Sequence, residues 1–468
     1  MMKVNMLLQR YHLIHQRIIR QDIFQNKMSI NYSSSDNMLQ NEQHKLTPIE
    51  GLLGTTDSKT LLGMIVQIEQ NQYYLEDPTG SVPIDLSQVQ FPSTDGFITE
   101  YSIVLIEGQM SEDGEMLIVH TIGHPMYESR NDAIEHIGLQ NSNIFDTIPN
   151  LNELVRLQNE ELEHGPFGMF VLLSDVHLDD LNVLEKLEAL FQGFQDFADD
   201  ENDDGGDSPL PVFILMGDFA SAYPSYSNGG GSGASGGQGS NSSSTSYKSF
   251  VMNLFDELAN IIVKFPKIAQ EGRFVLIPSM NDVGLGNTLP RPPLPRYFLK
   301  GLQSKVKHVH LASNPCRLRY FSKEIVISRI DVLSKLRKNC ILPPRDSYSN
   351  MDDEEVMEDM IETRNSMDEL IQHSIKTILD QGHLCPVPLR TSPIYWQYDH
   401  AMRLYPTPDI LILSESTTKQ YSEKYENDVE VMNPGPFYVD HKFLVIKPCD
   451  VTDDNDELFV NVEFSKID

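Results

Sequence analysis

Three residues of the kinds that bind metal ions follow two apolar stretches in the middle of the chain. Asp175 and His177 come shortly after the run 171–173, and Asp218 follows the run 212–216. Enzymes that hydrolyse phosphate esters with two metal ions hold the ions about 3.5–4 Å apart. Because each ion needs most of a coordination shell, several ligands must converge on one edge of a sheet. Asp175, His177 and Asp218 are therefore candidate metal ligands.

Alternating strands and helices are the elements that would position these residues. From residue 166 to 468, short apolar runs alternate with segments of helical periodicity, which is typical of an α/β domain with layered sheets flanked by helices. Crossover helices are expected at 183–194 and 249–265. Strands are expected at 169–173, 212–216, 273–277, 324–327 and 410–413. The candidate ligands then follow the first two strands.

The order of these motifs resembles the calcineurin-like metallophosphoesterase superfamily, whose motifs run DxH, GD, GNH(D/E), a lone His and GHxH. Asp175 and His177 match the first motif, and Asp218 matches the second. Asp282 stands at the acidic position of the third motif, after the expected strand 273–277. The resemblance therefore implies that these four residues occupy former ligand positions.

The remaining ligands of that superfamily are missing. No Asn-His pair precedes Asp282, Ser328-Arg329 stands where the lone His belongs, and residues 414–417 replace both histidines of the last motif. His383 could be a substitute ligand, but it lies beside a segment broken by prolines, and a buried packing role is favoured. The favoured interpretation is a degenerate site with no catalytic residue, metal or cofactor. The alternative is an active divalent-metal phosphodiesterase that uses Asp175, His177, Asp218 and Asp282.

The pattern of apolar residues changes in the segment 46–127. Five short runs rich in β-branched and aromatic residues are separated by turn-forming segments, which predicts a small barrel of the OB type. OB barrels that bind single-stranded nucleic acid use basic grooves. Here Lys59 is the only Lys or Arg between Leu46 and Ser129, against thirteen Asp and Glu. A structural or protein-binding barrel is favoured, and a single-strand binder remains an alternative.

Composition limits the partners further. The 468 residues carry a formal net charge of −32, which repels nucleic acid backbones and argues against a chain that grips DNA alone. The four cysteines form no CxxC pair, so we expect neither a zinc site nor a disulfide framework. No run approaches the roughly 18 apolar residues of a membrane span, and no membrane partner is expected. Residues 3–21 combine basic residues with apolar residues at helical spacing, which favours an amphipathic helix over a targeting peptide.

These patterns predict a division into an N-terminal helix with a polar tail, a barrel, a linker and an α/β domain, at 1–45, 46–127, 128–165 and 166–468. Flexible inserts, acidic or rich in Gly and Ser, are expected near 199–207, 228–246 and 346–370. The second insert contains a GxSxG match at 233–237. A nucleophile elbow needs a strand, a sharp turn and a helix, which such a coil cannot supply.

An OB barrel followed by an inactivated phosphoesterase domain resembles the B subunits of eukaryotic replicative DNA polymerases, in particular those of the epsilon type. The stretches that carry this resemblance are 7–24, 61–87, 274–295, 313–318, 376–389, 392–413 and 431–437. The resemblance implies a non-catalytic accessory subunit in the nucleus, which binds the C-terminal cysteine-rich module of a catalytic polymerase subunit, assembles with smaller polymerase subunits and meets DNA only through the complex. In that family a further N-terminal helical domain contacts the replicative helicase. Only six residues precede Leu7 here, so contact with the helicase is left as an open alternative.

Overall fold

The computed structural model of the chain forms two compact units, each described here by itself. Unit 1 consists of Met1–Ile137 and Val332–Thr407, and unit 2 of Gly138–Asp331 and Pro408–Asp468. The described residues are 2–21, 23–24, 45–70, 72–89, 96–137, 151–201, 210–224, 242–284, 286–342, 344, 362–451 and 458–467. Most of the predicted polar tail and large parts of the three predicted inserts lie outside these residues. No helix in the described ranges is long and apolar enough to cross a membrane.

Unit 1 contains a closed five-stranded barrel, as predicted. Its strands follow each other around the barrel in the order β1-β2-β3-β6-β5. Their bounds are β1 Lys59–Glu69, β2 Gln72–Asp77, β3 Gly80–Asp85, β5 Ile103–Met110 and β6 Leu117–Gly123. Alternate residues fill the interior, among them Leu61, Ile65, Leu75, Val104 and Val119. Gly63 of β1 is required by close packing, since a Cβ there would lie 2.5 Å from the Leu75 side chain.

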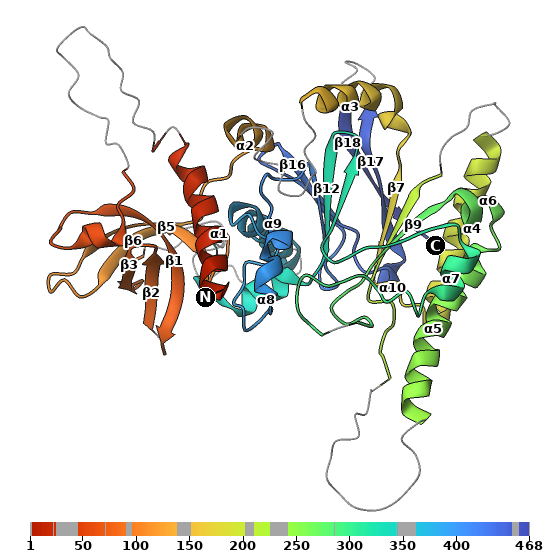
Figure 1. Ribbon diagram of the computed structural model, residues 1–468, viewed down its shortest axis with the longest axis horizontal. Coiled ribbons are helices and arrows are strands. Elements are labelled where there is room, and N and C mark those ends of the chain that lie inside the picture. Colours follow the sequence, from red (N-terminus) through yellow and green to blue (C-terminus); the bar gives the residue numbers. More distant parts are fainter. Residues whose placement is uncertain are drawn as a thin grey trace, which may run out of the picture. The chain divides into compact units, whose positions relative to one another are not determined.

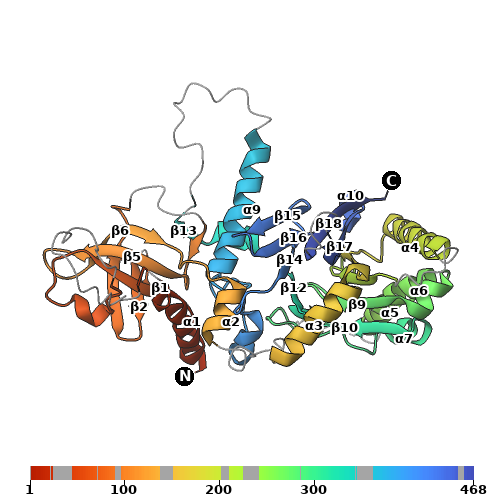
Figure 2. The same cartoon turned by 90° about the horizontal axis from the view of Figure 1, so that it is seen from above.

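The predicted N-terminal helix is present as α1 (Met2–Ile19), which packs against the barrel. Its buried residues Ile14 and Ile18 contact Leu62, Met64 and Val66 of β1. These three alternate with the residues that fill the barrel, so they point to its outside. Figures 1 and 2 both show α1 running alongside β1 and β2. The apolar stripe of the helix therefore covers one outer face of the barrel.

The segment from residue 332 to 407 belongs to unit 1, although the sequence predicted it within a continuous domain from 166 to 468. It contains α8 (Val332–Lys338), β13 (Cys340–Leu342), α9 (Glu362–Asp380) and the 3₁₀ helix η4 (Trp396–Met402). Strand β13 pairs with β4 (Ile98–Thr99) beside the barrel. The Gln381 side chain also hydrogen-bonds both backbone groups of Ile103 in β5, at 2.9 and 2.7 Å. These contacts join residues that are far apart in the chain, so a local sequence pattern cannot predict them. Each unit therefore consists of two separate stretches of the chain.

Unit 2 contains two stacked sheets. The six-stranded sheet has the order β10-β9-β8-β7-β17-β18 and the five-stranded sheet the order β11-β12-β14-β16-β15. The first consists of β7 Phe170–Ser174, β8 Val212–Met216, β9 Arg273–Ile277, β10 His308–Leu311, β17 Lys442–Val451 and β18 Leu458–Lys466. The second consists of β11 Cys316–Tyr320, β12 Lys323–Arg329, β14 Ile410–Ser414, β15 Tyr421–Tyr425 and β16 Val429–Asn433. All five strands predicted for this part of the chain are confirmed.

The central strands of unit 2 are buried on both faces, which explains their continuous apolar runs. Leu172 of β7 packs between the two sheets against residues such as Ile327 and Ile412. The next residue, Leu173, faces the opposite side and packs with Phe191 and Phe255 of the covering helices. Each strand therefore contributes to two separate cores.

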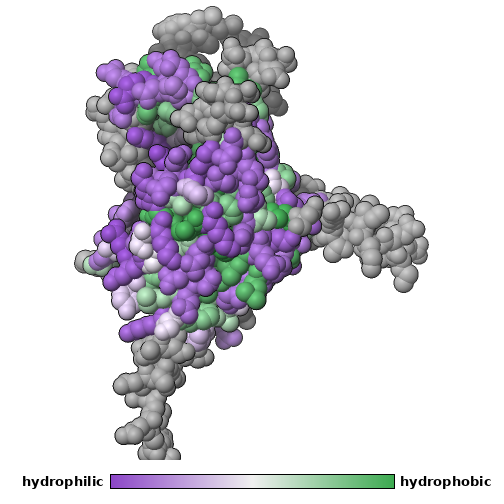
Figure 3. All heavy atoms as spheres, turned by 90° about the vertical axis from the view of Figure 1, so that its right-hand side faces the viewer, coloured by the Kyte–Doolittle hydropathy of each residue, from purple (hydrophilic) through white to green (hydrophobic). Residues whose placement is uncertain are grey.

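Helices cover the outer face of the six-stranded sheet. Its core includes residues of α4 (Leu181–Glu201), α5 (Ser242–Ile262), α6 (Pro266–Glu271) and α7 (Lys300–Lys305). Both predicted crossover helices are confirmed, and they extend into segments predicted as coil at 199–201 and 242–246. Helix α9 likewise begins within the predicted insert 346–370. The face shown in Figure 3 is largely hydrophilic with separate hydrophobic patches.

The packing of α1 leads to a first prediction. Replacing Ile14, which is 1% exposed, by Ala removes buried methyl groups and should lower the stability of unit 1 by about 2–4 kcal/mol. Urea unfolding followed by the fluorescence of Trp396, the single tryptophan of the chain, measures this because Trp396 lies in unit 1. The control Val4→Ala, at a position 57% exposed, should leave the transition unchanged. Equal effects of both substitutions would contradict the packing described for α1.

Candidate functional site

Parallel pairing brings three of the four predicted ligand positions to one edge of the six-stranded sheet. In register, Ser174 at the end of β7 lies beside Met216 of β8, which lies beside Ile277 of β9. Asp175, Asp218 and Asp282 follow these strand ends. The backbone N–H of Asp218 donates a hydrogen bond to Asp175 Oδ1 at 3.3 Å, and Ser279 Oγ donates to the Asp218 carboxylate. The three carboxylates therefore belong to one connected cluster.

The Asp175 carboxylate binds a guanidinium group, and both of its oxygens accept hydrogen bonds from the chain. The residue is 1% exposed, and its Oδ2 accepts a hydrogen bond from Ser174 Oγ at 2.8 Å. Its Oδ1 accepts a hydrogen bond from Arg329 Nη2 at 2.5 Å. Burial raises the pKa of the Asp175 carboxyl, and the Arg329 guanidinium only partly offsets this effect. The cation next to Asp175 is thus supplied by the protein itself.

Arg329 stands at the end of β12 in the five-stranded sheet and connects several groups of the site. Its Nε donates to the carbonyl oxygen of Gly217 at 2.6 Å, and its Nη1 lies 3.4 Å from the carboxylate of Asp331. Burial lowers the pKa of the guanidinium, but the carboxylates of Asp175, Asp331 and Asp218 outweigh burial and raise it above its ordinary value. Sequence reasoning noted Arg329 only as the residue that replaces an expected histidine. The signal for Arg329 in the sequence was a single basic residue at the end of an apolar strand.

The Asp282 carboxylate connects the loop after β9 to the loop after β8 by hydrogen bonds. Its Oδ1 accepts hydrogen bonds from the backbone N–H of Phe219 and the hydroxyl of Tyr223, each at 2.8 Å. Its Oδ2 accepts a hydrogen bond from the N–H of Ser279 at 2.7 Å. Burial raises the pKa of this carboxyl. A Cβ at Gly217 would lie 1.8 Å from Asp282 Oδ2, so only glycine fits there.

The other two candidates face neighbouring polar or aromatic groups. Asp218 is half-buried and accepts a hydrogen bond from Asn281 Nδ2 at 3.1 Å. His177 stacks on Tyr438, with ring centroids 4.2 Å apart and planes inclined by 18°. The His177 ring makes no hydrogen bond or ion pair with any described residue. The structure therefore places His177 in an aromatic stack, apart from the hydrogen-bonded aspartates.

The positions that replace the last two histidine motifs also make hydrogen bonds. Ser414 Oγ bonds to Ser174 Oγ, joining the ends of β14 and β7. Ser416 donates to Asp331 Oδ1 through its N–H at 2.7 Å and its hydroxyl at 2.9 Å. Across the described residues, no group of three or more His, Cys, Asp and Glu side chains is arranged to hold a metal ion. The groups at these strand ends can neutralise the charge of the aspartate carboxylates and hold them in place by hydrogen bonds.

His383, the proposed substitute ligand, lies in unit 1 and is 2% exposed. Its Nε2 lies 3.3 Å from Asp399 Oδ1, and its Nδ1 accepts a hydrogen bond from the N–H of Cys385 at 3.0 Å. Burial lowers the pKa of His383 to about 4. Arg10 of α1 and Arg403 also bind the Asp399 carboxylate. His383 therefore has the packing role that the sequence favoured.

Two family models match the chain. The model described as "DNA polymerase epsilon subunit 2-like, OB-fold domain" matches residues 1–126, and the model of the B subunits of DNA polymerases alpha and epsilon matches residues 170–423. The first match spans the closed barrel and confirms the prediction of an OB fold. The second spans more than half of the chain.

Curated relatives carry names from the same family. "DNA polymerase epsilon subunit 2" of Homo sapiens is 33% identical over 446 residues, which cover 93% of this chain and 72% of that protein. The DNA polymerase epsilon B subunit of Arabidopsis thaliana is 30% identical over 440 residues, 94% of this chain and 73% of that protein. The Saccharomyces cerevisiae protein of that name is 31% identical over 476 residues, 93% of this chain and 66% of that protein. The resemblance to B subunits is therefore confirmed.

The geometry around Asp175 leads to a second prediction. Arg329→Met leaves a buried carboxylate without its counter-charge, which should destabilise unit 2 by about 3–5 kcal/mol. Hydrogen exchange of the amides of β7 and β12 measures this loss locally. The control Arg319→Met removes an exposed pair whose nitrogen and oxygen are 3.9 Å apart, and should cost about 0–1 kcal/mol. An Arg329→Met protein with wild-type protection would show that the ion pair is dispensable.

A third prediction concerns pH. A carboxyl whose pKa is raised by folding stabilises the folded state at low pH, and this contribution is lost as the pH rises through the folded pKa. Burial raises the pKa of Asp175, and loss of the Arg329 guanidinium raises it further. The stability difference between wild type and Arg329→Met should therefore be largest near pH 7 and shrink towards about pH 4. Hydrogen exchange across this range, corrected for intrinsic rates, measures the difference. A deficit that is constant or grows as the pH falls would contradict the assignment.

Proposed function

The chain belongs to the family of B subunits of DNA polymerases alpha and epsilon, and we propose that it is the non-catalytic accessory subunit of a DNA polymerase epsilon complex. In this role it binds the C-terminal cysteine-rich module of the catalytic subunit. Smaller polymerase subunits are further partners, and the complex acts in the nucleus. DNA is reached through the complex, and the replicative helicase is a further candidate partner.

One observation carries the non-catalytic role. The guanidinium of Arg329 lies 2.5 Å from Asp175, one of the four positions that the resemblance to metallophosphoesterases gives as former metal ligands. A guanidinium supplies positive charge and donors only, so it cannot bind and activate a water molecule as a metal ion does. The motif order and the convergence of aspartates at the strand ends support descent of unit 2 from a metallophosphoesterase. The alternative of an active phosphodiesterase has no such support.

Exposed aromatic side chains in unit 1 are candidates for the partner interface. Trp396 and Tyr398 of η4 are 47% and 55% exposed, and Tyr395 is 45% exposed. Protein interfaces are enriched in aromatic residues, which often contribute most of the binding energy. Tyr405, a nearby aromatic residue, is instead buried and donates a hydrogen bond to Glu128 at 2.6 Å. The interface proposal is therefore limited to residues 395–398.

The fourth prediction tests the function directly. The tagged full chain, co-expressed with the catalytic polymerase subunit of the same organism, should purify with that subunit in near-equal amount. The double substitution Trp396→Ala with Tyr398→Ala should weaken the complex about tenfold or more. The control Tyr297→Ala, at a position 52% exposed in unit 2, should not weaken it.

The outcome that contradicts the proposal is equally specific. The chain would purify alone and hydrolyse a phosphodiester when Mn²⁺ is added. Asp175→Asn and Asp218→Asn would each abolish that hydrolysis. A complex that forms normally with the Trp396 and Tyr398 variant would refute the interface alone and leave the accessory role intact.

A further inference from the structure

A pocket of about 670 Å³ opens in unit 2 at the end of the strands opposite the aspartate cluster. Its lining includes the first residues of three neighbouring strands, which are Phe170 of β7, Val212 of β8 and Arg273 of β9. Leu318 and Tyr320 of β11 line it from the other sheet. The pocket therefore reaches between the two sheets and has an apolar interior. Its volume lies within the range of about 300–1,000 Å³ that is common for ligand pockets.

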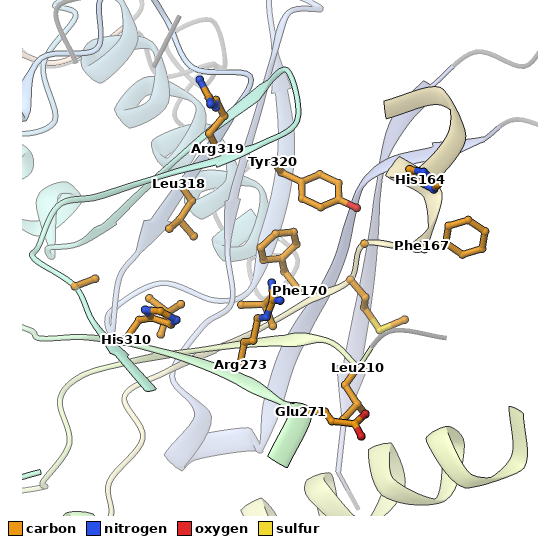
Figure 4. A pocket seen from close by; sticks show the side chains of 15 residues that line it. His164, Phe167, Phe170, Leu210, Glu271, Arg273, His310, Leu318, Arg319 and Tyr320 are labelled. Carbon is orange, nitrogen blue, oxygen red and sulfur yellow. The ribbon is translucent and has the colours of Figure 1, made fainter. Parts of the chain in front are cut away.

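Charged side chains surround this apolar interior. Figure 4 shows the rings of Phe170 and Tyr320 in the centre, with Arg273 below them and Arg319 above. Phe170 and Tyr320 contact each other edge to face, with centroids 5.5 Å apart. The Arg273 guanidinium has no hydrogen-bond or ion-pair partner among the described residues, and Arg319 lies 3.9 Å from Glu153. Among the described residues of the lining, Glu271 is the one with an acidic side chain.

One of the segments that line the pocket lies in a positively charged stretch of a chain that is strongly acidic. Between Asp282 and Glu324 there is no Asp or Glu, but there are eight Lys and Arg, whereas the whole chain has a net charge of −32. This segment supplies β10 and β11, both of which contribute lining residues. Such a local excess of one charge attracts a partner of the opposite sign.

Two sheet edges border the same pocket. Strand β10 is the outermost strand of the six-stranded sheet, and β11 is the outermost strand of the five-stranded sheet. In the described part of the chain, β10 pairs only with β9, and β11 only with β12. An outermost strand offers backbone N–H and C=O groups that an extended peptide can pair with. The pocket therefore combines side-chain and backbone binding groups.

We propose that this pocket binds a short extended segment of a partner polypeptide. One bulky apolar side chain of that segment enters between the sheets and packs on Phe170 and Tyr320. Asp or Glu residues beside it pair with the guanidinium groups of Arg273 and Arg319. This site is separate from the residues proposed to bind the catalytic subunit and does not depend on that proposal. A nucleic acid backbone fits less well, because its phosphates need a row of exposed cations and not an apolar cavity.

The test is a selection from a library of short randomised peptides displayed on phage, with the full chain as the target. Enriched sequences should combine Phe, Trp, Leu or Ile with neighbouring Asp or Glu. Fluorescence polarisation with a labelled copy of the best peptide then gives the dissociation constant. Arg273→Glu and Ala312→Trp, the second of which fills the pocket without changing a charge, should each weaken binding about tenfold or more.

A matched control makes the result specific. Arg337→Glu introduces the same charge change at an exposed position of unit 1 and should leave binding unchanged, and circular dichroism checks that each variant is folded. A selection that returns no binder, or binders without acidic residues, would overturn the proposal. So would peptides that bind Arg273→Glu and Ala312→Trp as tightly as the wild type. A labelled DNA duplex that binds instead, with loss in Arg273→Glu and steep salt dependence, would identify the site as a nucleic acid contact.

Discussion

The buried ion pair between Asp175 and Arg329 is the interaction on which the arrangement of unit 2 depends. Asp175 ends a strand of one sheet and Arg329 ends a strand of the other, so the pair joins the two sheets at the edge where the aspartates converge. Removing each charge from water costs several kcal/mol, and attraction offsets this cost only when the geometry is good and the remaining donors are satisfied. The Gly217 carbonyl and the Asp331 carboxylate provide those further partners. The strand register thus determines whether this charged cluster can be buried at all.

The same pair neutralises charge at an edge of the sheet where carboxylates converge. Converging carboxylates repel one another, so the edge of the sheet requires a cation whether or not chemistry occurs there. A metal ion meets this need and leaves a position for water, whereas a guanidinium meets it and leaves none. Backbone and side-chain donors such as those of Ser279 hydrogen-bond the carboxylate oxygens of Asp282 and Asp218. The charge at this edge is therefore neutralised by groups of the chain itself.

Much of this could be predicted from local sequence, and the limits have a physical reason. The strands of unit 2 were predicted with ends at most two residues from those observed, because residues buried on both faces leave continuous apolar runs. The convergence of Asp175, Asp218 and Asp282 followed from parallel pairing. Arg329 could not be assigned as the partner of Asp175, since the two are 154 residues apart and meet only through the packing of two sheets. The same holds for the stack of His177 on Tyr438 and for the pairing of β13 with β4.

The two ends of the sheets in unit 2 differ in whether their charged side chains are paired within the chain. At the end with the aspartates, every carboxylate has donors from the chain itself, and Arg329 is fully enclosed. At the other end, the Arg273 guanidinium is exposed beside an apolar cavity, and among the described residues the edge strands β10 and β11 each pair on one side only. An internally neutralised cluster contributes stability but offers little to a partner, whereas an exposed charge beside apolar surface costs little until a complementary group arrives. The end with the exposed Arg273 guanidinium is therefore the end suited to recognition.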